Sequence, residues 1–163
     1  MEDVRWLSDE EQALWRAILH AERAVDRAID LRLQENSKIS TADFSVLVTL
    51  SEAPEMTVRM RELGDSLNWD RSRTSHQVTR MERRGLVQKL RCECDNRGID
   101  VSLTDEGYRI VQTAAPDHVR LVRKVVFDVL GDDVNSEAVI AVLNRVAAAA
   151  EAESGETTKQ VTK

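Results

Sequence analysis

The sequence predicts a mostly α-helical protein with a small β-ribbon, and three observations support this prediction. Apolar residues recur at three- and four-residue steps over much of the chain, which is the spacing of amphipathic helices. Two short β-prone runs, 86–90 and 99–103, stand close together in the middle of the chain. Only 4% of the residues are aromatic, so Ala, Leu and Val must build the core. We therefore expect long helices at both ends and a compact helix-and-ribbon unit between them.

The first expected helix covers residues 8 to about 36. Ser8 and Glu11 form the capping-box pattern that marks a helix start, and an apolar stripe follows at helical spacing: Leu14, Ile18, Ala21, Val25, Ala28 and Ile29. A second helix is expected over 41–50, with Thr41 as its cap. Pro54 stops this helix, and residues 56–58 are expected to add a short strand.

Residues 60–84 have the pattern of a helix-turn-helix. One apolar stripe on a short helix is formed by Met60, Leu63 and Leu67. A polar turn follows, in which Trp69 is expected to pack against the rest of the motif. Asp70 is a good N-cap for a second helix that extends to residue 84. Its inward face is expected to hold Thr74, Val78 and Met81. The remaining polar side chains suit phosphate and base-edge hydrogen bonds, and they are Arg71, Ser72, Arg73, Ser75, His76, Thr79 and Arg80.

The two β-prone runs are joined by a polar loop that carries Asp95, Asn96 and Arg97. A helix followed by a two-stranded ribbon with an arginine at its tip is typical of a winged helix-turn-helix. The helix fits the major groove of DNA, and an arginine on a thin ribbon reaches the minor groove. We therefore add Arg91 and Arg97, on the ribbon, to the expected DNA contacts.

The charge distribution agrees with this prediction, although the whole chain has a net charge of −6. Residues 59–97 hold ten Lys and Arg residues against six Asp and Glu, a local net charge of +4. Residues 1–58 carry −6 and residues 98–163 carry −4. Local potential governs contact with phosphates, so the positive charge lies where the motif needs it.

The C-terminal part predicts two more helices. One opens at Thr104 and extends to about Leu130, with a kink or break expected at Pro116, and the last covers about Ser136 to Ala150. The apolar stripes of the terminal helices exceed what one small lobe can cover, which favours a homodimer. The expected organisation is an N-terminal dimerisation helix (1–40), a winged helix-turn-helix lobe (41–104), C-terminal dimerisation helices (105–151) and a disordered tail (152–163).

The segment RELGDSLNWDRSRTSHQVTRMERRGLVQK, followed by CDNRGIDVSLTDEG, resembles the core of the MarR family of bacterial transcription regulators. The matching motifs are D-x-R before the second wing strand, R-G-L-V after the recognition helix and L-T-x-x-G at the next helix. The resemblance implies a dimeric, sequence-specific DNA-binding regulator, most often a repressor, on a pseudo-palindromic operator. Many such regulators bind small aromatic ligands beside the dimer helices, which makes Trp15, His20, Arg23 and Phe44 candidates for a ligand pocket.

Cys92 and Cys94 leave an alternative open, because two close thiols in the wing loop can sense oxidants. A metal site is not expected, since the three histidines lie far apart. The chain shows no enzyme motif such as a phosphate loop or G-x-S-x-G, and we expect neither catalysis nor a cofactor. No apolar run reaches the ~20 residues of a membrane span, and the acidic N-terminus lacks a signal-peptide pattern. A soluble cytoplasmic protein is the expectation.

Overall fold

The computed structural model describes residues 4–91, 98–131 and 134–161, and their side chains as far as residue 153. The chain divides into two compact units, Met1–Val122 and Arg123–Lys163. In the first unit the order is α1 (Asp9–Ser37), α2 (Thr41–Glu52), a 3₁₀ turn η1 (Pro54–Met56), β1 (Thr57–Arg59), α3 (Met60–Ser66), α4 (Arg71–Arg83), β2 (Val87–Arg91), β3 (Ile99–Leu103) and α5 (Asp105–Val122). The second unit holds the π-helical turn η2 (Arg123–Phe127), α6 (Asp128–Leu130) and α7 (Ser136–Val161).

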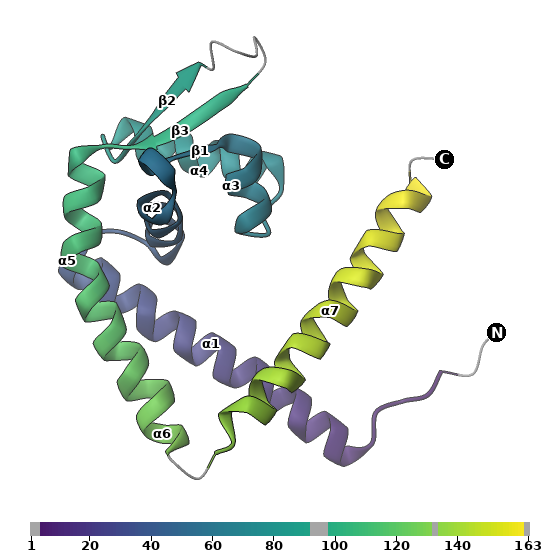
Figure 1. Ribbon diagram of the computed structural model, residues 1–163. Helices are drawn as coiled ribbons and strands as arrows, with labels where there is room; N and C mark the ends of the chain where they lie inside the picture. The colour runs from purple at the N-terminus through teal and green to yellow at the C-terminus, as the bar shows by residue number, and fades with distance from the viewer. Residues whose placement is uncertain (1–3, 92–97, 132–133, 162–163) are drawn as a thin grey trace. The chain divides into compact units, whose positions relative to one another are not determined.

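The sheet of the first unit is antiparallel, in the strand order β1–β3–β2. Val101 at the centre of β3 is paired with Val58 of β1 and with Lys89 of β2. Figure 1 shows the β2–β3 ribbon projecting beyond the helices that lie against the sheet. This arrangement of α3, α4 and a projecting ribbon is a winged helix-turn-helix, as the sequence predicted.

One hydrophobic core joins these elements. Val46 and Leu47 of α2, Leu63 of α3, Val78 of α4 and Val101 of β3 are all 0% exposed. Partly buried side chains of α1 and α5, including Ile29 and Ile110, pack against this cluster. Leu33 of α1 and Ala114 of α5 are buried in the same core, which therefore fixes α4 and the sheet to α2, α1 and α5.

Two capping boxes start the first two helices. Ser8 caps α1 together with Glu11, as the sequence predicted. The cap of α2 is Ser40 rather than Thr41: the Ser40 side chain accepts a hydrogen bond from the Asp43 N–H, and Asp43 accepts one from the Ser40 N–H. The prediction of Thr41 was wrong by one residue, because both residues have capping hydroxyls and the long-range contacts decide between them. The N–H and hydroxyl of Thr41 instead donate to Asp30 of α1.

The C-terminal helices differ from the prediction in two places. The helix is not broken at Pro116, because α5 extends to Val122, and the change to π-helical geometry comes at residues 123–127. The carbonyl that loses its hydrogen-bond donor at Pro116 belongs to Gln112, which is itself an exposed residue. The last helix, α7, extends to Val161, beyond the end expected at about Ala150. Alanine and glutamate in 147–153 favour helix, and no proline follows them.

Gly107 opens α5 at a position that only glycine fits. A Cβ atom there would lie 2.1 Å from the carbonyl oxygen of Leu86 and 2.8 Å from Leu103 Cδ1. Thr104 caps the same turn, because its hydroxyl oxygen accepts from the Gly107 N–H at 3.0 Å and its hydroxyl donates to the backbone just before β2. This close approach locks the start of α5 against the chain that enters β2 and explains the L-T-x-x-G motif physically.

Among the described residues, no helix combines the length and the apolar character that a membrane span requires.

Candidate nucleic-acid interface

The recognition helix candidate is α4, and its first turn is well anchored. The Asp70 carboxylate accepts a hydrogen bond from the Arg73 N–H at 2.9 Å, which confirms Asp70 as the N-cap. Thr74, Val78 and Met81 are buried, as predicted. Gln77 is buried with them, which the apolar pattern did not indicate. The helix therefore has one inward face and one face open to solvent.

The turn between α3 and α4 depends on a close contact at Gly64. A Cβ atom at this position would lie 2.9 Å from Thr74 Oγ1 and 3.3 Å from the carbonyl oxygen of Trp69. The Trp69 N–H donates to the Gly64 carbonyl at 2.9 Å, and the Thr74 hydroxyl donates to the Asp70 carbonyl at 2.9 Å. These bonds fix the angle at which α4 leaves the turn.

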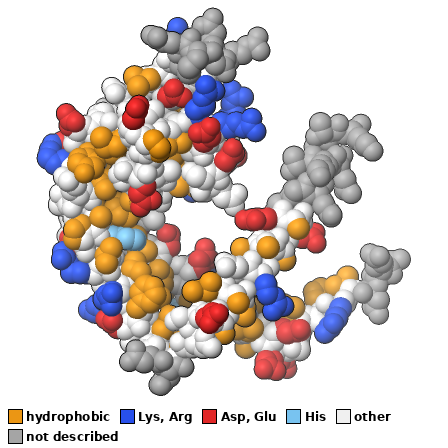
Figure 2. Space-filling model, in the orientation of Figure 1, with side chains coloured by type: hydrophobic (Ala, Val, Ile, Leu, Met, Phe, Trp, Pro, Cys, Tyr) orange, Lys and Arg blue, Asp and Glu red, His pale blue; other side chains and the backbone are white. Residues whose placement is uncertain are grey.

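The outward face of α4 carries most of the predicted DNA contacts. These side chains are exposed in the structure, and they are Arg71, Ser72, Arg73, Ser75, His76 and Arg80. Arg83, also exposed, was missed by the sequence reasoning. It follows Ser72, His76 and Thr79 at steps of four, three and four residues, so helical spacing alone places it on their face. Figure 2 shows Lys and Arg side chains gathered near the β2–β3 ribbon.

Arg73 is held above the ring of Trp69. Its guanidinium carbon lies 4.5 Å from the centre of the indole ring, which is the geometry of a cation–π contact. Trp69 is itself partly buried and packs against the hydrophobic core. The tryptophan thus does more than fill space in the turn, because it restrains an arginine at the start of the recognition helix.

Thr79 lies against the wing instead of standing free. Its hydroxyl donates to the Ser75 carbonyl at 2.7 Å and accepts from Lys89 Nζ at 2.8 Å. Lys89 Nζ also lies 3.0 Å from Glu82 Oε2, and this lysine, through its side-chain hydrogen bond, holds the pKa of the Glu82 carboxyl below its ordinary value. The Lys89 side chain thus joins strand β2 to Thr79 and Glu82 of α4. Thr79 remains a predicted DNA contact, and its hydroxyl already makes two hydrogen bonds inside the protein.

The wing itself is described up to Arg91 and again from Gly98. Arg91, at the outer end of β2, is exposed and paired in register with Ile99. At the same end of β3, one residue along from Ile99, Asp100 Oδ1 lies 3.8 Å from Arg59 Nε of β1. The predicted contact Arg97 lies outside the described residues, as do Cys92 and Cys94. In the part of the chain that is described, no group of three or more His, Cys, Asp or Glu side chains could hold a metal ion.

The four ligand-pocket candidates lie in different surroundings. Trp15 lines a shallow, apolar surface cavity that is open to solvent near the start of α1, together with Trp6, Leu7, Gln12 and Arg16. Phe44 is buried, with its ring centre 4.8 Å from that of His118 on α5. His20 and Arg23 are exposed on α1, outside the residues that line this cavity. The structure does not bring the four side chains together within one chain.

His118 is a partner of Phe44 that the sequence did not connect with it. Its Nδ1 atom is buried without a hydrogen-bond partner among the described residues, and desolvation lowers the pKa of the imidazole. The neighbouring Asp117 carboxylate accepts hydrogen bonds from Arg120 and from Asn36 of α1, which hold its pKa below the ordinary value. The Asn36 bond also ties the end of α1 to α5, and Figure 1 shows that the end of α1 lies next to α5.

Comparisons with known proteins agree with this geometry. The model of the MarR family matches residues 39–99. The HTH-type transcriptional regulator PecS of Dickeya dadantii is 27% identical over 103 residues, which cover 62% of this chain. The match spans 61% of PecS, less than two thirds of its length.

Solved structures extend the similarity over nearly the whole chain. Sco3205, a MarR family transcriptional regulator from Streptomyces coelicolor solved in complex with DNA, is 35% identical, with a TM-score of 0.82 and coverage of 93% of this chain and 92% of that one. AbsC from the same organism is 34% identical, with a TM-score of 0.83 and coverage of 93% and 99%. At this identity and coverage, together with the family match, the chain belongs to the MarR family of transcriptional regulators.

Proposed function

We propose that this protein is a sequence-specific DNA-binding repressor that acts as a homodimer and leaves its operator when a small ligand binds. The observation that carries the proposal is the division of α4 into two faces. Its inner face is buried in the core, while Ser72, His76 and Arg83 lie outward beside further arginines. Hydroxyl, imidazole and guanidinium groups on a rigid helix are the donors and acceptors that read base edges and phosphates.

DNA as the partner is supported by the charge near α4 and by the relatives. Residues 59–97 carry the local excess of positive charge in a chain whose net charge is −6. Sco3205 and the transcriptional regulator MOSR of M. tuberculosis were both solved in complex with DNA. In this reading α4 enters the major groove and the β2–β3 ribbon follows the backbone toward the minor groove.

The homodimer is supported by the terminal helices. Every side chain of α7 that is described is exposed, and among them are Val139, Ile140, Leu143 and Val146. On α1, Leu14, Trp15 and Ile18 are exposed as well. Apolar side chains in such numbers need a surface that covers them, and a second copy of the same helices supplies it. A twofold dimer implies a pseudo-palindromic operator with half-sites about 10 bp apart.

The proposed ligand site is the surface cavity beside Trp15. The cavity at Trp15 is apolar and lined by a second tryptophan, Trp6, which suits a flat aromatic molecule. The alternative, release through oxidation of Cys92 and Cys94, concerns residues outside the described part. The two readings differ in one experiment: the double change Cys92→Ser and Cys94→Ser leaves the response to peroxide unchanged if the ligand reading holds, and abolishes it if the thiols are the sensor.

The proposed function is tested by selecting binding sites from a pool of randomised DNA duplexes and footprinting the best one. We expect a symmetric footprint with two half-sites. His76→Ala should weaken binding to the selected site about tenfold and leave binding to a scrambled duplex unchanged. Arg97→Ala should weaken both equally, because a wing arginine that contacts backbone carries little sequence information. A pool that yields no enriched sequence would overturn the proposal.

A further inference from the structure

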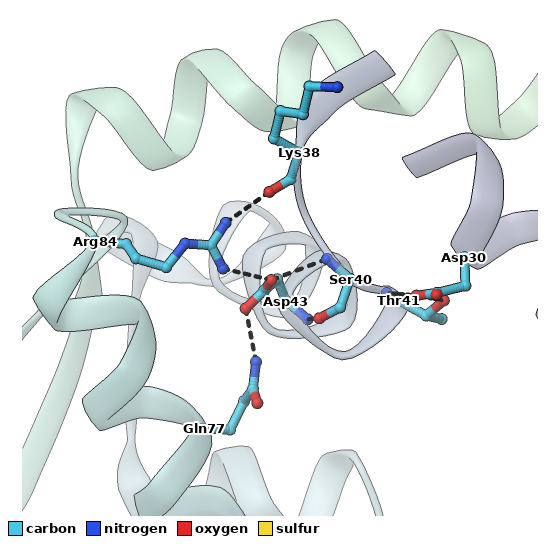
Figure 3. Close-up of polar contacts among 7 residues, drawn as sticks. All are labelled: Asp30, Lys38, Ser40, Thr41, Asp43, Gln77 and Arg84. Atoms are coloured by element: carbon cyan, nitrogen blue, oxygen red, sulfur yellow. Dashed lines mark hydrogen bonds and ion pairs between the residues drawn. The ribbon is translucent and has the colours of Figure 1, made fainter. Parts of the chain in front are cut away.

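The carboxylate of Asp43 is buried where three helices meet. Asp43 is 2% exposed, and it accepts three hydrogen bonds: from the Ser40 N–H, from Gln77 Nε2 at 2.7 Å and from Arg84 Nη1 at 2.7 Å. Figure 3 shows the side chains of Gln77 and Arg84 converging on it. A buried carboxylate is stable only while its oxygens keep such donors, so this arrangement strongly restrains each of its partners.

Two of the donors belong to the recognition helix. Gln77 lies within α4, and Arg84 is its C-cap, seven residues further along. Seven residues are close to two turns, so both side chains lie on the same side of the helix, about 10 Å apart along its axis. Two attachments on one side of a rod fix both its tilt and its rotation. Val78 and Met81 pack beside them, but apolar contacts alone permit small rotations that a hydrogen bond does not.

Arg84 also links this point to the end of α1. Its Nη2 donates to the Lys38 carbonyl at 2.8 Å, and Lys38 is the C-cap of α1 with a left-handed φ of 55°. The Asp43 network, which we define as Asp43, Ser40, Gln77, Arg84 and Lys38, therefore joins the end of α1, the start of α2 and two points of α4 (Figure 3).

We infer that Asp43 is a positioning residue for DNA recognition: through Gln77 and Arg84 it sets the orientation of α4, and thereby which side chains of the outer face meet the bases. This inference rests on the proposed function. It separates specificity from affinity, since the side chains of Asp43 and Gln77 are buried in the protein, away from any surface that DNA could reach. Loosening the network should let α4 turn, which costs base contacts while the flanking arginines still find phosphates.

The test changes the donors and leaves the carboxylate intact, because Asp43 also caps α2 and its loss would damage that helix. Gln77→Leu removes one donor without changing charge or much volume. Arg84→Lys keeps the positive charge but loses the planar fork that bonds Asp43 and the Lys38 carbonyl together. The matched control is Val111→Ala on α5, because Val111 is 8% exposed, as Gln77 is, and belongs to the same core without touching the network.

Each variant is titrated with the selected duplex and with a scrambled one, and its stability is measured by urea unfolding. We expect Gln77→Leu to lower the ratio of the two affinities about tenfold, the loss expected of one base contact, with binding to scrambled DNA unchanged. Arg84→Lys should lower the ratio in the same direction, and the double variant by less than the product of the two effects, since both act through Asp43. Val111→Ala should lose stability and keep the ratio.

Two outcomes would overturn the inference. One is an unchanged ratio in Gln77→Leu and Arg84→Lys despite lower stability, and the other is an equal fall of the ratio in Val111→Ala. Failure of the proposed function looks different, because then the unaltered protein itself fails to distinguish the selected duplex from the scrambled one.

Discussion

The winged helix-turn-helix core and α7 use similar apolar residues in opposite surroundings. In the core, Val46, Leu47 and Val78 are 0% exposed. On α7, Val139, Leu143 and Val146 are exposed by 39%, 61% and 63%. The same aliphatic side chains thus complete a core in one region and leave an uncovered stripe in the other. The difference indicates that one region is stable through its own contacts, whereas the other requires a second surface.

The largest expected effect comes from disrupting the contact between the apolar stripe of α7 and the surface that covers it. Changing Ile140→Glu together with Leu143→Glu should convert the dimer to monomer, because four apolar side chains per dimer, each contributing about 1.5 kcal/mol, would be replaced by charges. The measurement is sedimentation at micromolar concentration. Ala141→Glu with Ala148→Glu adds the same charges on the opposite side of α7 and should leave the dimer intact. A double Ile140 and Leu143 variant that stays dimeric would show that α7 is not the interface.

The next effect concerns the stability of the winged helix-turn-helix core at the start of α5. Gly107→Ala should destabilise the protein by about 3 kcal/mol or more, because the new Cβ atom meets a backbone carbonyl that cannot move away. Gly85→Ala is the matched control: its φ is 72° and nothing lies within 4 Å, so only backbone strain of about 1 kcal/mol is expected. Urea unfolding gives both values. Equal losses would mean that the contact between Leu86 and α5 relaxes without cost.

A smaller effect concerns Trp69, which packs against the core and restrains Arg73 on the outer face of α4. Trp69→Leu removes the ring beneath Arg73 and should weaken binding to the selected duplex about threefold, the value of one exposed cation–π contact. In the variant Arg73→Ala, the further change Trp69→Leu should have no additional effect on DNA affinity. An additional loss in that background would place the role of Trp69 elsewhere than in holding the arginine.

The smallest effect is a pH dependence at His118. Burial lowers the pKa of this imidazole in the folded protein below its unfolded value of about 6.5. The unfolded chain therefore binds the proton first, and stability, fully present above the unfolded pKa, falls as the pH drops below it. Thermal unfolding at pH 7.5 and 5.5 should show a larger decrease for the natural protein than for His118→Leu. The same decrease in both proteins would show that groups other than His118 cause it.

The sequence by itself determined the elements and the inward face of the recognition helix. Capping at Ser8 and Asp70, the burial of Thr74, Val78 and Met81, and the second ribbon strand at 99–103 all agree with expectation. These features depend on residues a few positions apart, where helical and strand periodicity leave a direct pattern. The family resemblance followed from the same local motifs, and the comparisons confirm it.

Only the tertiary structure decided which polar groups meet across the fold. Gln77 and Arg84 reach Asp43 over 34 and 41 residues of sequence, and Lys89 reaches Thr79 from another element. From the sequence, Gly107 was known only as the glycine of the L-T-x-x-G motif. The structure gives the reason for it, because a Cβ atom there would lie 2.1 Å from the Leu86 carbonyl oxygen. Such contacts have no periodic signature, because a hydrogen bond or a close approach depends on where two distant segments lie in space. The sequence pattern records only which face of each segment turns inward.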